Sequence, residues 1–431
     1  MMSLNGWKRC NLDEIAYLDL ETLAASTSKD WVFYYLDISS ASEGRLILPA
    51  AEIRFRDAPS RARKVVHLKD VLMSMVRPNL KAFAYFDHTD APCVASTGFA
   101  VLTAKDETCP RFILYAILSE HVSRQIDGLV IGSNYPAINS TAVRTLQILT
   151  PPRPEQDKIA EILSTLDLAI EQTEALIVKQ QRVKVGLMQD LLAFGIDEHG
   201  ILRSEECHEF KDSLLGRIPS TWEVKPLDTL LASINQGWSP DCNSDPASQG
   251  EWGVLKTTAV LWDGYRDHEN KGLPQLMAPR PHLEIMPGDL LMTRAGPNSR
   301  VGVISYVYKT RSKLMLSDKI YRLVPTSEVD SRFLCYSLSS SKSQRHLSNL
   351  KTGMAESQTN ISQEIVKELL TVCPPLPEQS IIADRLDQVT SESNQIAAVL
   401  SKLKALKTAL MQDLLTGRKS VTSLLASLDV I

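Results

Sequence analysis

The chain has 431 residues, of which 44% are hydrophobic and 23% charged, and its formal net charge is −4. At roughly 150 residues per domain, this length predicts two or three globular units, each large enough to bury its own core. The composition excludes a low-complexity disordered chain and a collagen-like repeat, and the weak negative charge excludes a protein that coats nucleic acid indiscriminately.

Membrane and secretion signals are not apparent in the sequence. No stretch approaches roughly 18 consecutive apolar residues, and the N-terminus lacks the basic segment and apolar run of a signal peptide. We therefore expect a cytoplasmic protein without membrane contact. The seven cysteines are scattered without a CxxC pair, which is typical of thiols in a reducing compartment. We expect neither a disulfide framework nor a metal site.

Charge is distributed unevenly along the chain. Residues 52–81 contain eight basic and three acidic residues, and residues 294–351 contain eleven basic and three acidic residues. Residues 151–200 carry five basic and nine acidic residues. Because local charge decides nucleic-acid binding, the two basic segments are candidate contact surfaces.

Two regions of the sequence have the pattern of small mixed α/β domains. Short segments rich in β-branched and aromatic residues alternate there with Gly, Pro, Asn and Ser, which predicts short strands joined by turns. The predicted strands are residues 31–38, 99–103, 302–308 and 320–324, and the predicted helices are residues 112–125 and 331–338.

An internal repeat dominates the rest of the sequence. PPRPEQ at 151–156 recurs as PPLPEQ at 374–379, and LMQDLL at 187–192 recurs at 410–415. Both pairs are offset by 223, so the two segments align without a gap, and 18 of 42 positions are identical. Chance does not produce such an alignment, and we infer a duplication.

Each repeat predicts a long helix. Prolines followed by Glu155 or Glu378 are a helix-start pattern, because proline suits the first turn and an acid stabilises the positive end of the helix dipole. Apolar residues then recur at alternating steps of four and three, as in a coiled-coil seam. The seam residues are Ile159, Leu163, Leu166, Ile170, Ile177, Leu187 and Leu191 in the first helix, and Ile382, Leu386, Val389, Ile396, Leu400, Leu403, Leu410 and Leu414 in the second.

Each helix needs a partner that covers its apolar face. A lone heptad run usually forms a dimerisation coiled coil, but duplication within one chain favours pairing of the two helices with each other. We therefore predict an α+β fold in which two mixed α/β domains alternate with two long helices. The helices pair as an antiparallel coiled coil, which gives a pseudo-twofold internal repeat.

The predicted order of segments follows from the repeat. Residues 1–150 form the first globular domain, 151–196 the first helical region, and 197–219 an acidic, turn-rich connector. Residues 220–373 form the second globular domain, 374–418 the second helical region, and 419–431 a tail.

Catalytic motifs are absent from the sequence. We find no phosphate-binding GxxxxGK[ST] loop, GxGxxG turn, HExxH or GxSxG motif, and the eight histidines are dispersed. Asp70 and Asp289 precede matching apolar segments in the two halves, where a carboxylate could act in catalysis. Repetition of a turn carboxylate with its domain is the favoured explanation, and we predict no catalytic residue.

These motifs together resemble the specificity subunit of type I restriction-modification systems over essentially the whole chain. PPxPEQxxIAxxL occurs twice, at 151–163 and 374–386, LMQDLL ends each helical region, and KDSLLGRIPSTWEV (211–224) opens the second half. DVLMSMVRPNLKA (70–82) and STGF (96–99) also look like the family. The turn QGWSP at 236–240 has only SKDW (28–31) opposite it, so the loops of the two halves are not interchangeable.

The resemblance implies a function without catalysis by this chain. The two globular halves would be target-recognition domains for double-stranded DNA, and the target would be bipartite and asymmetric. Two methyltransferase subunits would dock on the helices, and restriction-translocase subunits would complete the complex. S-adenosylmethionine and ATP would belong to those partners, and this chain would bind no cofactor. The alternatives are a self-contained enzyme with a cryptic site near Asp289 or Asp241, and a scaffold that never binds DNA.

Side chains that reach phosphates and base edges would carry recognition. Our candidates for DNA contact are Arg61, Arg63, Lys64, Arg77 and Asn79 in the first half, and Arg294, Asn298, Arg300, Arg311 and Lys313 in the second. We further predict that the acidic face of the first helix, with Glu161, Glu171 and Glu174, meets the methyltransferase.

Overall fold

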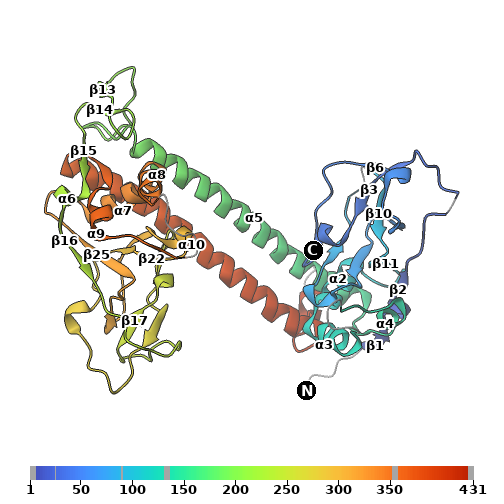
Figure 1. Cartoon of the computed structure of the whole chain (residues 1–431). Helices are drawn as coiled ribbons and strands as arrows, with labels where there is room; N and C mark the ends of the chain where they lie inside the picture. The colour runs from blue at the N-terminus through green and yellow to red at the C-terminus, as the bar shows by residue number, and fades with distance from the viewer. Residues whose placement is uncertain (1–5, 25, 89–90, 131–135, 352–357, 426–431) are drawn as a thin grey trace. The chain divides into compact units, whose positions relative to one another are not determined.

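The structure is a computed structural model (Figure 1), and it describes all residues except 1–5, 25, 89–90, 131–135, 352–357 and 426–431. The chain forms two compact units, Met1–Ala175 with Ala397–Ile431 (unit 1) and Leu176–Ile396 (unit 2). Each unit combines one globular half with part of each long helix. The contacts therefore group helix segments that lie far apart in the sequence.

Unit 1 contains two four-stranded sheets. The first has the order β2 (Ala16–Leu18), β11 (Phe99–Ala104), β8 (Val71–Ser74) and β9 (Phe83–Tyr85), with all neighbours antiparallel. The second has the order β6 (Ile53–Arg54), β3 (Val32–Leu36), β10 (Cys93–Ser96) and β7 (Ala62–Val66), in which β3 and β10 are parallel. A separate antiparallel pair joins β1 (Lys8–Asn11) to β12 (Gln147–Thr150).

The core of unit 1 lies between its first sheet and its helices. The apolar helix α2 (Pro110–Leu118) buries every residue from Phe112 to Leu118, and these pack with Val71, Met73 and Phe83 of the sheet. The predicted helix 112–125 is wrong in one respect, because it is two helices, α2 and α3 (Glu120–Leu129). Ser119 separates them in an extended conformation, and its side chain caps α3 by accepting a bond from the Val122 amide.

Unit 2 repeats this topology. Its main sheet has the order β16 (Leu231–Gln236), β25 (Ile320–Pro325), β21 (Leu290–Thr293) and β23 (Ile304–Tyr306), again antiparallel throughout. The second sheet is reduced to β20 (Asn270–Gly272), β17 (Gly253–Leu255) and β24 (Leu314–Met315), and it keeps one parallel pair, β17 with β24. The pair β15 (Glu223–Pro226) and β27 (Leu370–Cys373) corresponds to β1 and β12.

The helices of unit 2 also follow the repeat. α7 (Ser331–Ser339) and α8 (Ser341–Leu350) match α2 and α3, and Ser340 caps α8 as Ser119 caps α3. The α+β class and the main predicted strands are therefore confirmed. Among the described residues no helix is long and apolar enough to cross a membrane.

The two long helices are α5 (Arg153–Leu191) and α10 (Leu376–Leu415). In unit 1, Lys407 Nζ lies 2.5 Å from Asp167 and Lys404 Nζ lies 2.7 Å from Glu174, so the segments run antiparallel. In unit 2, Leu191 of α5 packs in one cluster with Ile382 and Leu386 of α10. An antiparallel arrangement of the two helices is thus present in unit 1, and the seam side chains also meet in unit 2.

The burial pattern agrees with the predicted seam. None of the fifteen seam residues is exposed, and Ile159, Leu163, Ile382 and Leu386 have exposures of 1% or less. Apolar residues off the seam, such as Leu168 at 54%, lie at the surface. The period of the sequence therefore identifies the buried face of each helix.

The glutamate of each PEQ motif joins the start of its helix to another segment of the same unit. In unit 1, Trp7 Nε1 donates to Glu155 Oε2 at 3.2 Å. In unit 2, Arg203 forms a bidentate pair with Glu378, at 2.5 and 3.1 Å, and the Ile196 amide also donates to Glu378. Both carboxylates are buried, and Glu155 joins its helix to the first globular half, whereas Glu378 joins its helix to Arg203 of the connector.

Candidate nucleic-acid interface

A basic loop follows β8 in unit 1. It contains the 3₁₀ turn η3 (Pro78–Leu80), and Arg77 and Lys81 on either side of the turn have φ values of 47° and 50°. The Arg77 amide donates to the Pro136 carbonyl at 2.7 Å, and Lys81 Nζ donates to the Leu118 carbonyl at 3.0 Å. These bonds hold the loop in its left-handed turns, and the side chains of Arg77 and Asn79 remain exposed.

The turn between β10 and β11 places Arg61 beside this loop. The Thr97 amide donates to the Arg61 carbonyl and the Met75 amide donates to the Gly98 carbonyl, both at 2.8 Å. Arg61 and the start of the Arg77 loop therefore flank one turn, Thr97–Gly98. Arg61 and Thr97 are exposed there, so polar and cationic groups gather at this edge of the sheets.

The other two cations predicted in unit 1 are tied to the domain. The Arg63 guanidinium lies 5.1 Å from the centroid of the Phe55 ring and donates to the Ala62 carbonyl. Lys64 is only 7% exposed, and its ammonium donates to Asp19 at 2.8 Å and to the Phe99 carbonyl. Lys64 points inward because Ala62, Lys64 and Val66 alternate on the buried face of β7. On this ground Lys64 leaves our set of DNA-contact candidates.

Arg294 occupies the corresponding edge of unit 2. Its guanidinium donates to the Asp318 carbonyl at 3.1 Å and to Asn360 Oδ1 at 2.5 Å, and it lies 5.2 Å from the Tyr321 ring centroid. The Ser239 hydroxyl bonds the Asp318 carboxylate, so the turn at 236–240 joins the same edge. The turn at Asp318 corresponds to Thr97–Gly98 of unit 1, and Lys319 is exposed beside it.

The remaining predicted DNA-contact residues of unit 2 lie in two separate places. Asn298 and Arg300 form the turn η6 (Asn298–Arg300), where Arg300 Nη2 donates to the Thr257 carbonyl at 3.1 Å. Arg311 and Lys313 precede β24 and donate to the carbonyls of Glu251 and Gly250. The structure therefore brings Arg294 and η6 together at the edge that follows β21. It places Arg311 and Lys313 elsewhere, at the N-terminal end of β24.

The sequence did not predict one exposed cation, Arg280. The Arg280 guanidinium stacks over the Trp238 ring at 4.0 Å from its centroid, and Arg280 is exposed. The two residues are 42 positions apart, and Arg280 lies outside the basic segment 294–351. The indole of Trp238 in the turn at 236–240 was the only local signal.

Asp70 and Asp289 have matching structural roles. Asp70 accepts bonds from the His67 amide and the Thr103 hydroxyl, and Asp289 accepts from the Met286 amide and pairs with Arg322 at 3.0 Å. Burial raises the pKa of both carboxyls. Each closes the turn before its strand, which supports the turn interpretation over a catalytic one. Within the described ranges, no group of three or more His, Cys, Asp or Glu could hold a metal ion.

The predicted acidic docking face needs a correction at Glu174. Its carboxylate pairs with Arg45 of the recognition half and with Lys404 of α10, both at 2.7 Å. These bonds join three elements of unit 1, so Glu174 is engaged within the chain. Glu161 pairs with Lys158 on its own helix, and Glu171 is exposed.

Comparison with known proteins identifies the family. The profile of the type I restriction modification DNA specificity domain matches residues 62–180 and 281–414, more than half of the chain. The chain belongs to this family, and the resemblance inferred from its motifs is confirmed.

Two curated relatives are specificity subunits of type I restriction enzymes. The EcoEI subunit of Escherichia coli is 40% identical over 185 residues, which are 42% of this chain and 31% of that protein. The MjaVIII subunit of Methanocaldococcus jannaschii is 25% identical over 313 residues, 68% of this chain and 67% of that protein. The match to the EcoEI subunit thus spans less than a third of its length.

Solved structures share the fold. The S subunit of a type I restriction-modification system from M. genitalium has a TM-score of 0.61 at 14% identity, covering 96% of this chain and 98% of that one. A chain from a study of assembly and conformational transition of the type I R-M system has a TM-score of 0.55 at 23% identity, covering 95% of this chain and 97% of that one. The α+β arrangement is therefore common to these proteins.

Proposed function

We propose that this chain is the non-catalytic DNA-recognition subunit of a type I restriction-modification complex. The observation that carries the proposal is the pair of globular halves with one topology and different surface loops. Unit 1 presents Arg61, Arg77 and Asn79 around its Thr97–Gly98 turn, whereas unit 2 presents Arg294 and η6 around the turn at Asp318. Different side chains on one scaffold suit two different half-sites, so the target is bipartite and asymmetric.

The chemistry of these edges fits duplex DNA. Arginine and lysine contact phosphates and guanine edges, and asparagine contacts adenine, each good bidentate pair contributing roughly 1–3 kcal/mol of discrimination. Arg61, Arg77 and Asn79 are all exposed in unit 1. The half-buried Arg294 and Arg300 are held by carbonyl groups, which would fix their direction before DNA binds.

The long helices complete the proposal. We infer that α5 and α10 continue as one antiparallel coiled coil with a pseudo-twofold relation between the repeats. The antiparallel ion pairs of unit 1 and the seam cluster of unit 2 support this inference. The helices would hold the two half-sites at a fixed separation and dock two methyltransferase subunits, to which restriction-translocase subunits would add. S-adenosylmethionine and ATP would be bound by those partners, in the cytoplasm.

The test is co-expression with the methyltransferase subunit of the same host, followed by sequencing of the methylated DNA. We expect a bipartite motif that changes in one half only when residues 1–150 are exchanged for those of a relative. Methylation that does not depend on this chain would overturn the proposal. Nuclease or methyl-transfer activity of the purified chain would favour a self-contained enzyme, and assembly without any duplex binding would favour a scaffold.

Single substitutions distinguish a direct DNA contact from the effect of the protein's overall charge. Arg77→Ala should weaken duplex binding and lower the slope of log affinity against log salt by about one, as expected for loss of one phosphate contact. The control is Arg124→Ala, because Arg124 is exposed on α3 of the same unit and its guanidinium is paired with Glu120. An unchanged slope for Arg77→Ala would remove this loop from the interface.

A further inference from the structure

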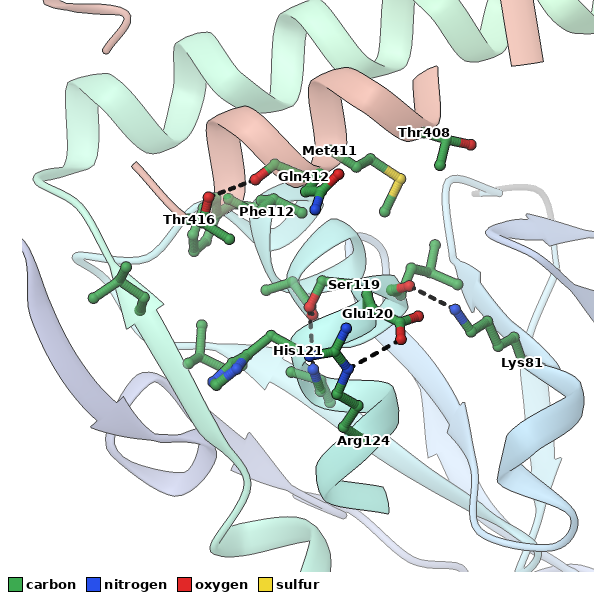
Figure 2. A pocket seen from close by; sticks show the side chains of 16 residues that line it. Lys81, Phe112, Ser119, Glu120, His121, Arg124, Thr408, Met411, Gln412 and Thr416 are labelled. Carbon is green, nitrogen blue, oxygen red and sulfur yellow. Dashed lines mark hydrogen bonds and ion pairs between the residues drawn. The ribbon is translucent and has the colours of Figure 1, made fainter. Parts of the chain in front are cut away.

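A cavity in unit 1 has no role in the proposed function. It has a volume of about 360 Å³ and lies between the α2–α3 corner and the end of α10. Figure 2 shows Thr408, Met411 and Gln412 of α10 on one wall and Ser119, Glu120 and His121 on the other. The floor includes Phe112 and Leu415. This volume is within the roughly 300–1,000 Å³ of clefts that hold ligands.

The internal repeat identifies the matching place in unit 2. α7 and α8 correspond to α2 and α3 at an offset of 221, and the shared capping serines Ser119 and Ser340 fix the alignment. The end of α5 corresponds to the end of α10 at the offset of 223, so Met188 matches Met411 and Leu192 matches Leu415. On the opposite wall, Lys342 matches His121.

In unit 2 the connector covers this place. Leu215 packs against the cluster that contains Met188, Leu192 and Phe333, the counterparts of Met411, Leu415 and Phe112. A Cβ atom on the next residue, Gly216, would lie 3.7 Å from Lys342 Nζ. The connector therefore spans both walls of the matching groove with one leucine and one glycine.

A tight turn presents Leu215 to the groove. The Ser213 amide and hydroxyl donate to the Gly216 carbonyl, and the Gly216 amide donates back to the Ser213 carbonyl at 3.0 Å. Gly216 has φ 92°, which a residue with a side chain rarely adopts. Leu214 points to solvent at 83% exposure, so the turn inserts one leucine and leaves its neighbour outside.

Unit 1 has the groove without such a turn. Within the described part of unit 1, the residues that line the cavity include no counterpart of Leu215 or Gly216. The rim carries His121 and Arg124, as the rim in unit 2 carries Lys342 and Arg345, and the connector turn has Asp212 just before it. The groove thus combines an apolar floor for leucine with a polar rim, on which Arg124 is paired with Glu120 and His121 holds the position of Lys342.

We propose that this groove of unit 1 is a docking site for another protein, which inserts a turn of the form acid-Ser-Leu-Leu-Gly. The occupant imitates the chain's own residues 212–216 in unit 2. The proposal does not depend on DNA recognition. It predicts an interaction surface on the first recognition half at the end of α10.

The probe is a fluorescein-labelled peptide with the sequence of residues 209–219, EFKDSLLGRIP, added to the full chain. We expect saturable fluorescence anisotropy with a dissociation constant of roughly 10⁻⁴ M, typical of a single apolar anchor. A peptide carrying Leu215→Ser should bind at least tenfold more weakly. The matched peptide carrying Leu214→Ser should bind as the parent does, because Leu214 stays outside the groove.

Protein variants locate the peptide. Met411→Lys should abolish binding, whereas Ala409→Lys, exposed on the same helix and outside the groove, should retain it. His121→Glu tests the other wall and should weaken binding severalfold by repelling Asp212 of the peptide. Circular dichroism of the variants confirms that each is folded.

Several results would overturn the proposal. Binding that ignores Leu215→Ser or Met411→Lys would place the peptide elsewhere, and no binding at all would show that the groove accepts no such turn. Binding that appears only when the chain ends at Leu425 would identify its own residues 426–431 as the occupant in place of another protein. Saturable peptide binding by the full chain, lost with Met411→Lys, supports the proposal.

Discussion

Gln156 and Gln379, 223 residues apart, make the same three hydrogen bonds in their two units. Gln156 Oε1 accepts from the Cys109 amide at 2.9 Å, and its Nε2 donates to the carbonyls of Pro151 and Glu107. Gln379 Oε1 accepts from the Asp330 amide at 3.0 Å, and its Nε2 donates to the carbonyls of Pro374 and Glu328. The glutamine of each PEQ motif thus joins the first turn of a long helix to its recognition half.

Both glutamines are buried, so their removal leaves main-chain groups without partners. We expect Gln156→Ala to destabilise unit 1 by about 1–3 kcal/mol, because the Cys109 amide and the Pro151 carbonyl lose their bonds away from water. Hydrogen exchange measured by mass spectrometry should show lost protection around Cys109. Gln379→Ala is the matched control and should expose the segment around Asp330 instead. Unchanged protection at Cys109 would contradict this role.

The seam of the long helices makes a second prediction. Leu163 is fully buried with Leu414 and Leu415 in unit 1, whereas Leu168 on the same helix is 54% exposed. Leu163→Ala should cost about 2–5 kcal/mol through lost burial and a cavity. Leu168→Ala should stay within about 0.5 kcal/mol of the parent. Urea denaturation followed by circular dichroism distinguishes the two, and equal costs would reject the seam assignment.

Sequence periodicity predicts these helices well because their burial follows from spacing along one chain. The PEQ and LMQDLL segments each occur twice. They fix the alignment of the two repeats and also carry the family resemblance. Side-chain direction within the sheets was harder to predict from composition. By positive charge alone, Arg61 and Lys64 are equivalent candidates. In the structure, the alternation of side chains along β7 directs Lys64 into the core, whereas Arg61 is exposed.

Tertiary contacts explain the features that the sequence analysis missed. Arg280 meets Trp238 only because the fold brings distant loops together. The break at Ser119 was visible in principle, since serine before an acidic residue is a helix-start pattern, but the apolar residues on both sides favoured one helix. The engagement of Glu174 by Arg45 depends on a contact over 129 residues of sequence.

The Glu174 junction predicts a pH dependence of stability. Hydrogen bonds from Lys404 and Arg45 lower the pKa of the Glu174 carboxyl below its ordinary value of 4.5. A carboxyl whose pKa is lower in the folded protein adds stability above its unfolded pKa and loses it as pH falls through the folded pKa. The contribution of Glu174 should therefore be present at neutral pH and decline as pH falls below about 4.5 and through the lower pKa of the folded protein.

The variant Glu174→Gln isolates this contribution. Its urea midpoint should lie below that of the parent at pH 7, and the difference should shrink as pH falls below the ordinary glutamate range. Glu171→Gln serves as control, because Glu171 is exposed one turn earlier on the same face. A difference that does not change with pH would mean that the charge of Glu174 adds no stability.

Lys64 tests whether its buried position, and not its positive charge, determines its role. Its ammonium pairs with Asp19, whose other oxygen accepts from the Val101 amide, so the pair joins β7 to the first sheet. Lys64→Met leaves the Asp19 carboxylate without its cation in a largely buried site, and we expect a loss of about 3–5 kcal/mol. The double variant with Asp19→Asn should recover part of this loss, because no uncompensated charge remains.

The salt dependence of DNA binding then separates Lys64 from Arg61. Lys64→Met, where it remains folded, should leave the slope of log affinity against log salt unchanged, because its ammonium lies inside the domain. Arg61→Ala should leave stability within about 0.5 kcal/mol and lower that slope by about one if the exposed guanidinium meets a phosphate. A stable Lys64→Met protein with a lowered slope would return Lys64 to the interface, because only a cation that reaches DNA releases counterions on binding.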